Sequence, residues 1–243
     1  MKDSMETANT GDRQLETLRL YGALIAVRED WGGRLVLCCG EGCAASGTPT
    51  AVSIAGGATL ALDADAAAVK AAMRRGELDF VVNTLDEALR ALKNEVRLRR
   101  PLSVGLTADV DAALREMVER GVLPDLLLIG ARQDGDAILQ NESIHALQAS
   151  GMSMQLAARS LEVVLSSSPR MILTSKRLDE DYLPAANTAE LRALDERLLA
   201  LLPVDDVVRR RWVQRVPQYL REARSGGRWV WLTEEERRAL QGV

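Results

Sequence analysis

The sequence predicts an α/β protein with a Rossmann-like parallel sheet of about four to five strands, flanked by helices and followed by a mainly helical C-terminal extension. Three observations lead to this prediction. Short apolar segments alternate with helical segments between residues 34 and 130, which is the order of βαβ units. A glycine-rich turn follows the first apolar segment. Beyond Gly130 the apolar residues recur mainly at helical spacing.

The elements follow in order along the chain. Apolar periodicity and turn residues predict helices over 13–29, 50–55, 64–75, 84–99 and 109–120, and strands over 34–39, 58–62, 102–106 and 125–129. Thr84 and Glu87 have the spacing of a capping box, so a helix should begin there. Gly121 should end the helix before it.

The C-terminal part of the sequence changes character. Helical periodicity is found over 160–165, 189–202 and 204–215, whereas 169–174 could be one more strand and 226–232 a turn followed by a short strand. We therefore divide the chain into an N-terminal helix, a Rossmann-like domain and a mainly helical extension with a Trp/Arg-rich end, over residues 1–30, 31–150 and 151–243.

Composition limits the partners. The 31 basic and 35 acidic residues are interspersed and give a net charge of -4, which argues against nucleic acid or an anionic membrane as the main partner. With no membrane-length apolar run and a polar N-terminus, we expect a cytoplasmic protein. The single histidine and three clustered cysteines fit no zinc spacing, so we expect no metal and reduced cysteines. We also expect a homodimer.

The candidate site is the turn after the first strand. Gly40, Gly42 and Ala45 form a G-x-G-x-x-A pattern, in which backbone approaches a pyrophosphate at a helix N-terminus. Asp63 ends the second strand, where an acid accepts hydrogen bonds from ribose hydroxyls and repels a 2′-phosphate. These features favour NAD over NADP. Glu41 opposes a diphosphate, and the alternative is that the glycines only make a tight turn.

Other candidate residues have a functional and a structural interpretation. Cys43 lies where a thiol pKa can be lowered, but a packed, inert thiol is favoured. His145 could act as an acid or base, although a surface histidine is the better interpretation. The late tryptophans and arginines could form an interaction surface or a helical core of their own, and the sequence favours neither.

Taken together, residues 34–125 resemble the central NAD-binding domain of urocanase (urocanate hydratase). The motifs that carry the resemblance fall in the family's order and spacing. They are GEGCAASGTP (40–49), IAGGATLALD (54–63), LDEAL (85–89), PLSVGL (101–106) and RGVLPD (120–125). The resemblance implies that Cys43, Ala44, Ala45 and Asp63 occupy NAD-contacting positions, and that Asp109 with Val110 replaces an Asn-Ala pair that also contacts the cofactor.

The sequence also departs from the family. An arginine that follows the ribose acid in urocanase is Ala68 here, and the family's signature after the fourth strand is replaced by Leu128–Gly135. No counterpart of the separate substrate domain is recognisable. In urocanase NAD acts as an electrophile toward the substrate imidazole, which requires polar groups that orient the ring. We therefore expect no urocanate hydratase activity.

Three hypotheses remain open at this point. The first is a urocanase-like module that binds a nucleotide or other small ligand at the Gly40–Ala45 turn. The second is a divergent enzyme of the lyase or hydratase type that uses NAD in the same cleft, with Asp63, Asp109, Arg132 or Asp134 at its rim. The third is a structural or oligomeric protein whose Trp/Arg-rich end packs on a partner chain.

Overall fold

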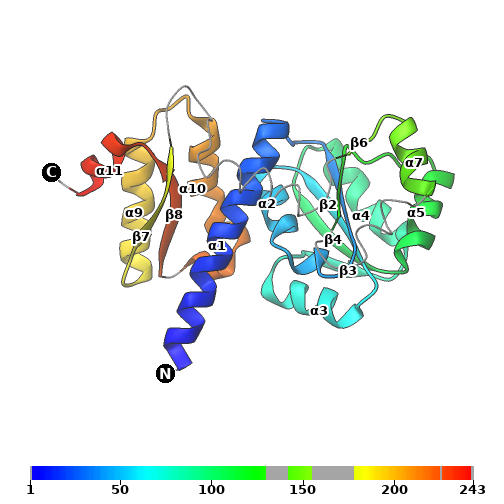
Figure 1. The fold of residues 1–243 in the computed structure, drawn as a ribbon, viewed down its shortest axis with the longest axis horizontal. Coiled ribbons are helices and arrows are strands. Elements are labelled where there is room, and N and C mark those ends of the chain that lie inside the picture. The colour runs from blue at the N-terminus through cyan, green and yellow to red at the C-terminus, as the bar shows by residue number, and fades with distance from the viewer. Residues whose placement is uncertain (1, 130–141, 155–177, 225, 242–243) are drawn as a thin grey trace. The chain divides into compact units, whose positions relative to one another are not determined.

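The computed structural model describes residues 2–129, 142–154, 178–224 and 226–241 (Figure 1). It divides into two compact units: Asp30–Val163, here called the sheet unit, and Met1–Glu29 with Val164–Val243, here called the terminal unit. The terminal unit therefore combines the first helix of the chain with its C-terminal part. The helix expected over 160–165 and the strand expected over 169–174 lie outside the described residues.

The sheet unit confirms the predicted fold class. Its sheet has six strands in the order β3-β4-β2-β1-β5-β6, and every pair is parallel. The strands are β1 (Leu35–Cys39), β2 (Ala58–Asp63), β3 (Phe80–Val82), β4 (Leu102–Thr107), β5 (Leu126–Ile129) and β6 (Ser153–Met154). Strands β3 and β6 were not predicted; they lie at the two edges of the sheet and have three and two residues.

Helices connect these strands, as expected for parallel pairs. They are α2 (Thr48–Ala55), α3 (Ala66–Arg75), α4 (Leu85–Arg97), α5 (Val110–Glu119) and α7 (Glu142–Ala149), with a short 3-10 turn η1 (Cys43–Ala45) before α2. Side-chain caps begin three of them: Asp65 for α3, Thr84 for α4 and Asp109 for α5. The Thr84 cap is the one predicted, although the Glu87 carboxylate accepts a hydrogen bond from the N–H of Asn83 rather than from that of Thr84.

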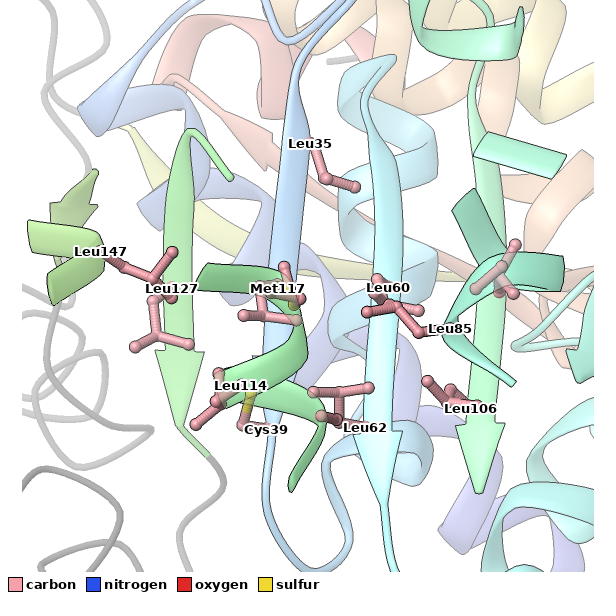
Figure 2. Packing of buried hydrophobic residues seen from close by; sticks show 14 of the residues in the cluster. Leu35, Cys39, Leu60, Leu62, Leu85, Leu106, Leu114, Met117, Leu127 and Leu147 are labelled. Carbon is pink, nitrogen blue, oxygen red and sulfur yellow. The ribbon is translucent and has the colours of Figure 1, made fainter. Parts of the chain in front are cut away.

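Strand alternation divides the core of the sheet unit into two faces. Successive side chains of a strand point to opposite sides. Leu60, Leu114, Leu127 and Cys39 belong to one buried cluster on the face that α4, α5 and α7 cover (Figure 2). On the other face Gly105 of β4 leaves room for α3, because a Cβ there would lie 2.8 Å from Val69 Cγ1. Both faces of the sheet are therefore covered, which explains its continuous apolar strands.

The terminal unit is mainly helical but contains a two-stranded antiparallel sheet, whose strands are separated in the chain by two helices. Its elements are α1 (Lys2–Val27), β7 (Asp179–Pro184), α9 (Thr188–Leu201), α10 (Val207–Tyr219), η2 (Arg221–Arg224), β8 (Gly227–Leu232) and α11 (Glu234–Gln241). Gln14 of α1 is bound to β8, since its Nε2 donates to the Gly227 carbonyl at 3.3 Å and its Oε1 accepts from the Trp229 N–H at 2.5 Å. The side chain of Gln14 thus satisfies backbone groups of β8.

Strand β7 was not predicted, because its DEDYLP sequence is rich in residues with low strand propensity. Pairing with β8 and charged partners stabilise it instead. Arg237 donates to both carboxylate oxygens of Asp181 at 2.7 and 2.8 Å, and Arg19 of α1 binds Glu180 at 2.7 Å. The strand forms because arginines elsewhere in the terminal unit carry the charge opposite to that of its acidic side chains.

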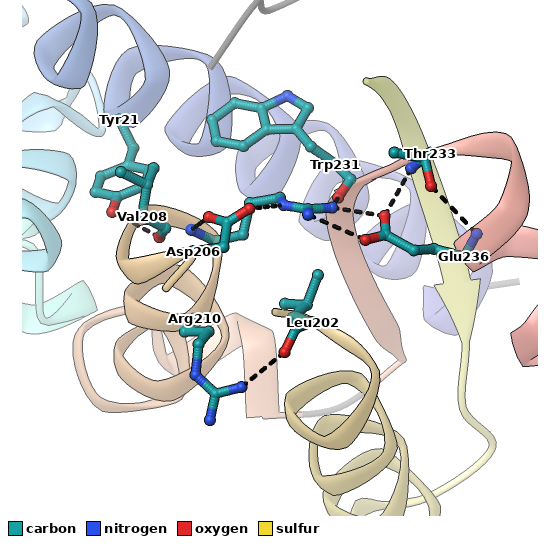
Figure 3. A network of polar contacts seen from close by, with 9 residues as sticks. Tyr21, Leu202, Asp206, Val208, Arg210, Trp231, Thr233 and Glu236 are labelled. Carbon is teal, nitrogen blue, oxygen red and sulfur yellow. Dashed lines mark hydrogen bonds and ion pairs between the residues drawn. The ribbon is translucent and has the colours of Figure 1, made fainter. Parts of the chain in front are cut away.

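A buried ion-pair network joins α10 to α11 (Figure 3). The Arg209 guanidinium binds Asp206 at 2.6 Å and Glu236 at 2.6 and 3.0 Å, and also donates to the Trp231 carbonyl at 3.1 Å. Glu236 and Thr233 exchange the two hydrogen bonds of a capping box at the start of α11. Although burial acts to raise it, the pKa of Glu236 is lowered by Arg209 and the Thr233 N–H.

Two of the three late tryptophans belong to the core of the terminal unit. Trp212 and Trp231 are 0% and 3% exposed, and both rings lie beside the ring of Tyr21. Arg228 is also fully buried, where it forms a bidentate pair with Asp195 at 2.7 and 2.6 Å. Of the two interpretations of the Trp/Arg-rich end, the structure supports a helical subdomain with its own core.

We predict that Thr59→Val stabilises the protein. The Thr59 hydroxyl is buried in β2 and has no hydrogen-bond partner among the described residues, so valine keeps the shape and strand propensity and removes a desolvated polar group. The expected gain in unfolding free energy is about 1 kcal/mol, measured by urea denaturation. Thr17→Val is the matched control, because that buried hydroxyl donates to the Arg13 carbonyl and its loss should destabilise. Equal effects would contradict the prediction.

We predict that Arg209→Ala destabilises the terminal unit strongly. The substitution leaves Asp206 and Glu236 without their buried cation, which should cost about 3 kcal/mol of unfolding free energy. Thermal and urea unfolding would measure this loss. Arg238→Ala is the control, since Arg238 pairs with Glu234 on the exposed surface of α11 and should change stability by less than about 0.5 kcal/mol.

Candidate functional site

The candidate site lies at the carboxyl edge of the sheet, at the end of β1. This strand pairs with β2 on one side and with β5 on the other. The chain passes from β1 to β2 in one direction, and β5 lies on the opposite side, so the connections diverge beyond Cys39. A crevice at such a switch point is where ligands bind in open α/β sheets.

Glycines shape the loop that leaves β1. Gly40 and Gly42 have φ values of 104° and 79°, in the left-handed region that favours glycine. A Cβ added to Gly42 would meet no described atom within 4 Å, so this glycine is required by its conformation and faces open space. The loop continues into η1, and α2 begins only at Thr48. If the glycine turn opened directly into a helix, that helix would begin at Ala45. Helix α2 begins three residues later, at Thr48.

Most backbone donors of this loop have partners inside the protein. The Gly40 N–H donates to the Leu62 carbonyl at 3.1 Å and extends the ladder between β1 and β2. The N–H groups of Cys43, Ala45 and Ser46 donate to carbonyls within the loop, at 3.1, 3.0 and 3.3 Å. In this conformation the loop is closed on itself, and an anion would have to replace some of these bonds.

Asp63 closes the loop from the neighbouring strand. It is the last residue of β2, and its side chain is buried, with 1% exposed. Oδ2 accepts from the Gly42 N–H at 3.0 Å, and Oδ1 accepts from the Asp65 N–H at 2.9 Å. Burial raises the pKa of Asp63, and this effect outweighs the two N–H bonds, which lower it. The acid expected at the ribose position thus also anchors the glycine loop.

The structure brings the sequence-predicted residues of the loop together with Asp63 and places Asp109 at a neighbouring strand. Cys43, Ala44 and Ala45 form η1, with Cys43 and Ala44 buried. Asp109 follows β4, is exposed, and caps α5 by accepting from the Ala112 N–H at 2.8 Å. Since Asp63 is paired in register with Thr107, both acids lie at the same edge of the sheet.

Two polar side chains that the sequence analysis missed complete the loop. Ser46 Oγ donates to the Cys43 carbonyl at 2.8 Å and lies 2.8 Å from Thr48 Oγ1. The short Ser-Gly-Thr spacing before a helix with proline at its start was the available signal, because hydroxyl side chains in such turns bind nearby backbone groups.

The expectation of reduced cysteines is wrong for Cys38 and Cys43. These two residues form a disulfide, with their Cα atoms 5.9 Å apart, a separation typical of such bonds. Cys38 lies in β1, and the glycine turn brings Cys43 back over it. Cys39 stays a buried free thiol, as expected, and burial raises its pKa. The clustering of the three cysteines argued against a disulfide framework but did not exclude one bond across a tight turn.

The other candidate site residues lie outside this loop or outside the residues that the structure describes. Arg132 and Asp134 fall in residues that are not described, and His145 is exposed on α7. Within the described ranges, no group of three His, Cys, Asp or Glu side chains could hold a metal ion. None of the helices in that part of the chain is long and apolar enough to cross a membrane.

A protein-family model matches part of this chain. The model described as the urocanase Rossmann-like domain covers residues 15–128 of this chain. The match begins within α1, includes the whole glycine loop and Asp63, and ends in β5. It therefore bears out the resemblance found in the motifs.

We predict that Asp63 makes folding less favourable as pH rises. Because the folded pKa is raised, the unfolded state releases its proton first, near pH 4, and ionisation of Asp63 in the folded protein then costs stability. In Asp63→Asn this pH-dependent penalty is absent. As pH rises above about 4, the unfolding free energy of the variant should increase relative to that of the parent. Parallel stability curves in urea titrations at each pH would contradict this assignment.

Proposed function

We propose that this chain is a binding module for a dinucleotide of the NAD type, because residues 15–128 match the model of the urocanase Rossmann-like domain, whose fold is a nucleotide-binding one. The ligand would lie at the carboxyl edge of the sheet, over the Gly40–Ala45 loop. The observation that carries the proposal is the hydrogen bond between Gly42 and Asp63, which joins the candidate diphosphate loop to the candidate ribose acid.

The acceptor capacity of Asp63 supports this placement. A carboxylate has about four lone-pair positions, and the described hydrogen bonds to Asp63 are donated by Gly42 and Asp65. The remaining positions could accept the two hydroxyls of a ribose. The negative charge would repel a 2′-phosphate, which favours NAD over NADP.

Binding requires a local change in the loop. Asp63 is buried, and the loop N–H groups donate to loop carbonyls, so a diphosphate would compete with these acceptors. The open space over Gly42 allows approach, and the left-handed glycines allow the backbone to turn. Charge-assisted hydrogen bonds are stronger than neutral ones, so the exchange can be favourable.

Urocanate hydratase activity is not part of the proposal. Ala68 carries no charge where the family has an arginine, and the family's signature after the fourth strand is absent from Leu128–Gly135. Without polar groups to orient an imidazole against the cofactor, bound NAD would lack the geometry for electrophilic catalysis. Incubation of the protein with NAD and urocanate, followed by ultraviolet absorbance, should show no consumption of urocanate.

The other hypotheses are less well supported. The single histidine, His145, lies on α7 and not in the loop, so the lyase hypothesis has no histidine in the loop to act with Asp63. The buried positions of Trp212 and Trp231 remove the main argument for an interaction surface at the C-terminal end. A homodimer and a cytoplasmic location stay predictions.

We predict that NAD binds and that Asp63→Ala abolishes binding. Isothermal titration of the parent should give a micromolar dissociation constant, because the ribose acid and glycine loop are both present. Asp65→Ala is the matched control, since Asp65 is an exposed acid two residues away that caps α3. Its binding should stay within about threefold of the parent. Absence of heat with the parent would refute the proposed function.

We predict that Glu41→Gln strengthens NAD binding. Glu41 is exposed between the two glycines of the loop, where its charge repels a diphosphate. Removing that charge should tighten binding about three- to tenfold at low salt, and the gain should shrink at high salt because the charge is solvent-screened. Glu116→Gln, on α5, serves as control and should leave affinity unchanged. Unchanged affinity in Glu41→Gln would place the diphosphate elsewhere.

A further inference from the structure

The disulfide between Cys38 and Cys43 encloses the first half of the candidate binding loop. One cysteine is fixed in the centre of the sheet by β1, and the other begins η1. The residues between them include both left-handed glycines, Gly40 and Gly42. The N–H of Gly42 is also the group that Asp63 binds. Among the described residues, this disulfide is the only covalent cross-link, and it ties the loop to β1.

The pairing is specific to these two cysteines. Cys39 is adjacent to Cys38, but strand alternation turns it to the opposite face, into the cluster with Leu114 and Met117. Burial raises the pKa of the Cys39 thiol, which keeps it protonated and a poor nucleophile. Cys39 therefore cannot reach Cys38 or Cys43 without leaving the core, and it serves as an internal control for the redox experiments below.

The short span of the bond makes its effect local. The entropic stabilisation that a disulfide provides increases with the length of the loop that it closes, and this loop contains only the four residues 39–42 between the cysteines. The fold of the sheet unit rests on its own buried core, which includes Leu37 and Leu60. Opening the bond should therefore release the loop without unfolding the sheet.

We propose that Cys38 and Cys43 form a reversible redox latch that holds the Gly40–Ser46 loop closed. Its oxidant is a low-molecular-weight disulfide, such as glutathione disulfide. The thiolate of Cys43, on the loop, attacks one sulfur of that disulfide, forms a mixed disulfide and releases one small thiol. The Cys38 thiolate then attacks the Cys43 sulfur and releases the second. Two protein thiols lose two electrons and two protons, and the small disulfide is reduced to two thiols.

The latch controls access to the loop. Both sulfurs are buried, with 1% of each residue exposed, so exchange requires the loop to open at its glycines. In the oxidised form the loop N–H groups stay bound to loop carbonyls and to Asp63. Once reduced, the loop is free to exchange these bonds for an anionic ligand. This consequence rests on the proposed function, and we expect reduced protein to bind NAD about tenfold more tightly than oxidised protein.

The first test does not involve a ligand. The full chain is equilibrated in buffers of reduced and oxidised glutathione, alkylated and digested, and the peptides are analysed by mass spectrometry. We expect a Cys38–Cys43 cross-link that appears and disappears reversibly while Cys39 stays alkylatable on unfolding. Hydrogen exchange of residues 40–46 should be faster in the reduced protein, with exchange in β1 and β2 unchanged. No cross-link, or equal loop exchange in the two states, would overturn the proposal.

The second test separates the latch from the proposed function. NAD titrations of parent, Cys43→Ala and Cys39→Ala are compared in both redox states. We expect a redox-dependent affinity in the parent and in Cys39→Ala, and a redox-independent one in Cys43→Ala. Equal affinity of the oxidised and reduced parent would overturn control of binding by the latch. If neither state binds NAD, the proposed function fails, while the cross-link and loop exchange still decide whether the latch exists.

Discussion

The position of β1 in the centre of a parallel sheet is the constraint on which the rest of the sheet unit depends. Strand β1 is paired on both sides up to Cys39, the Gly40 N–H continues the ladder with the Leu62 carbonyl, and the chain then turns away from the sheet. That turn contains left-handed glycines and is followed by a helix that begins only at Thr48. It also needs an acceptor for the Gly42 N–H. Asp63, at the end of the adjacent strand, provides that acceptor.

The same constraint explains why residues of the proposed site also stabilise this edge of the sheet. The Asp63 carboxylate binds the N–H groups of Gly42 and Asp65, and it does so where our proposal places a ribose. The site is therefore built in a closed form. Ligand binding would require the loop N–H groups to exchange the loop carbonyls and Asp63 for acceptors on the ligand. The ease of this exchange depends on the local stability of the loop rather than on that of the sheet.

The sequence predicted the sheet well where local pattern and tertiary role agree. The four central strands are continuous apolar runs, and the cap predicted at Thr84 begins α4. It failed where tertiary partners override local preference. Strand β7 forms despite its acids because Arg237 and Arg19 bind them, and β3 is too short and too exposed to give a periodic signal. The disulfide needed the geometry of the turn, which spacing alone did not provide.

The bonds between Gln14 and β8 join two parts of the sequence that are 213 and 215 residues apart. Since chains are made from the N-terminus, α1 emerges long before the strand that it binds. The sheet unit has all its strands in one continuous stretch and can fold while the rest is still being synthesised. The first helix can make these bonds only after Gly227 and Trp229 have been synthesised. Truncation before Gly227 would therefore leave Gln14 without its partners in β8 and the terminal unit incomplete, a natural substrate for chaperones and proteases.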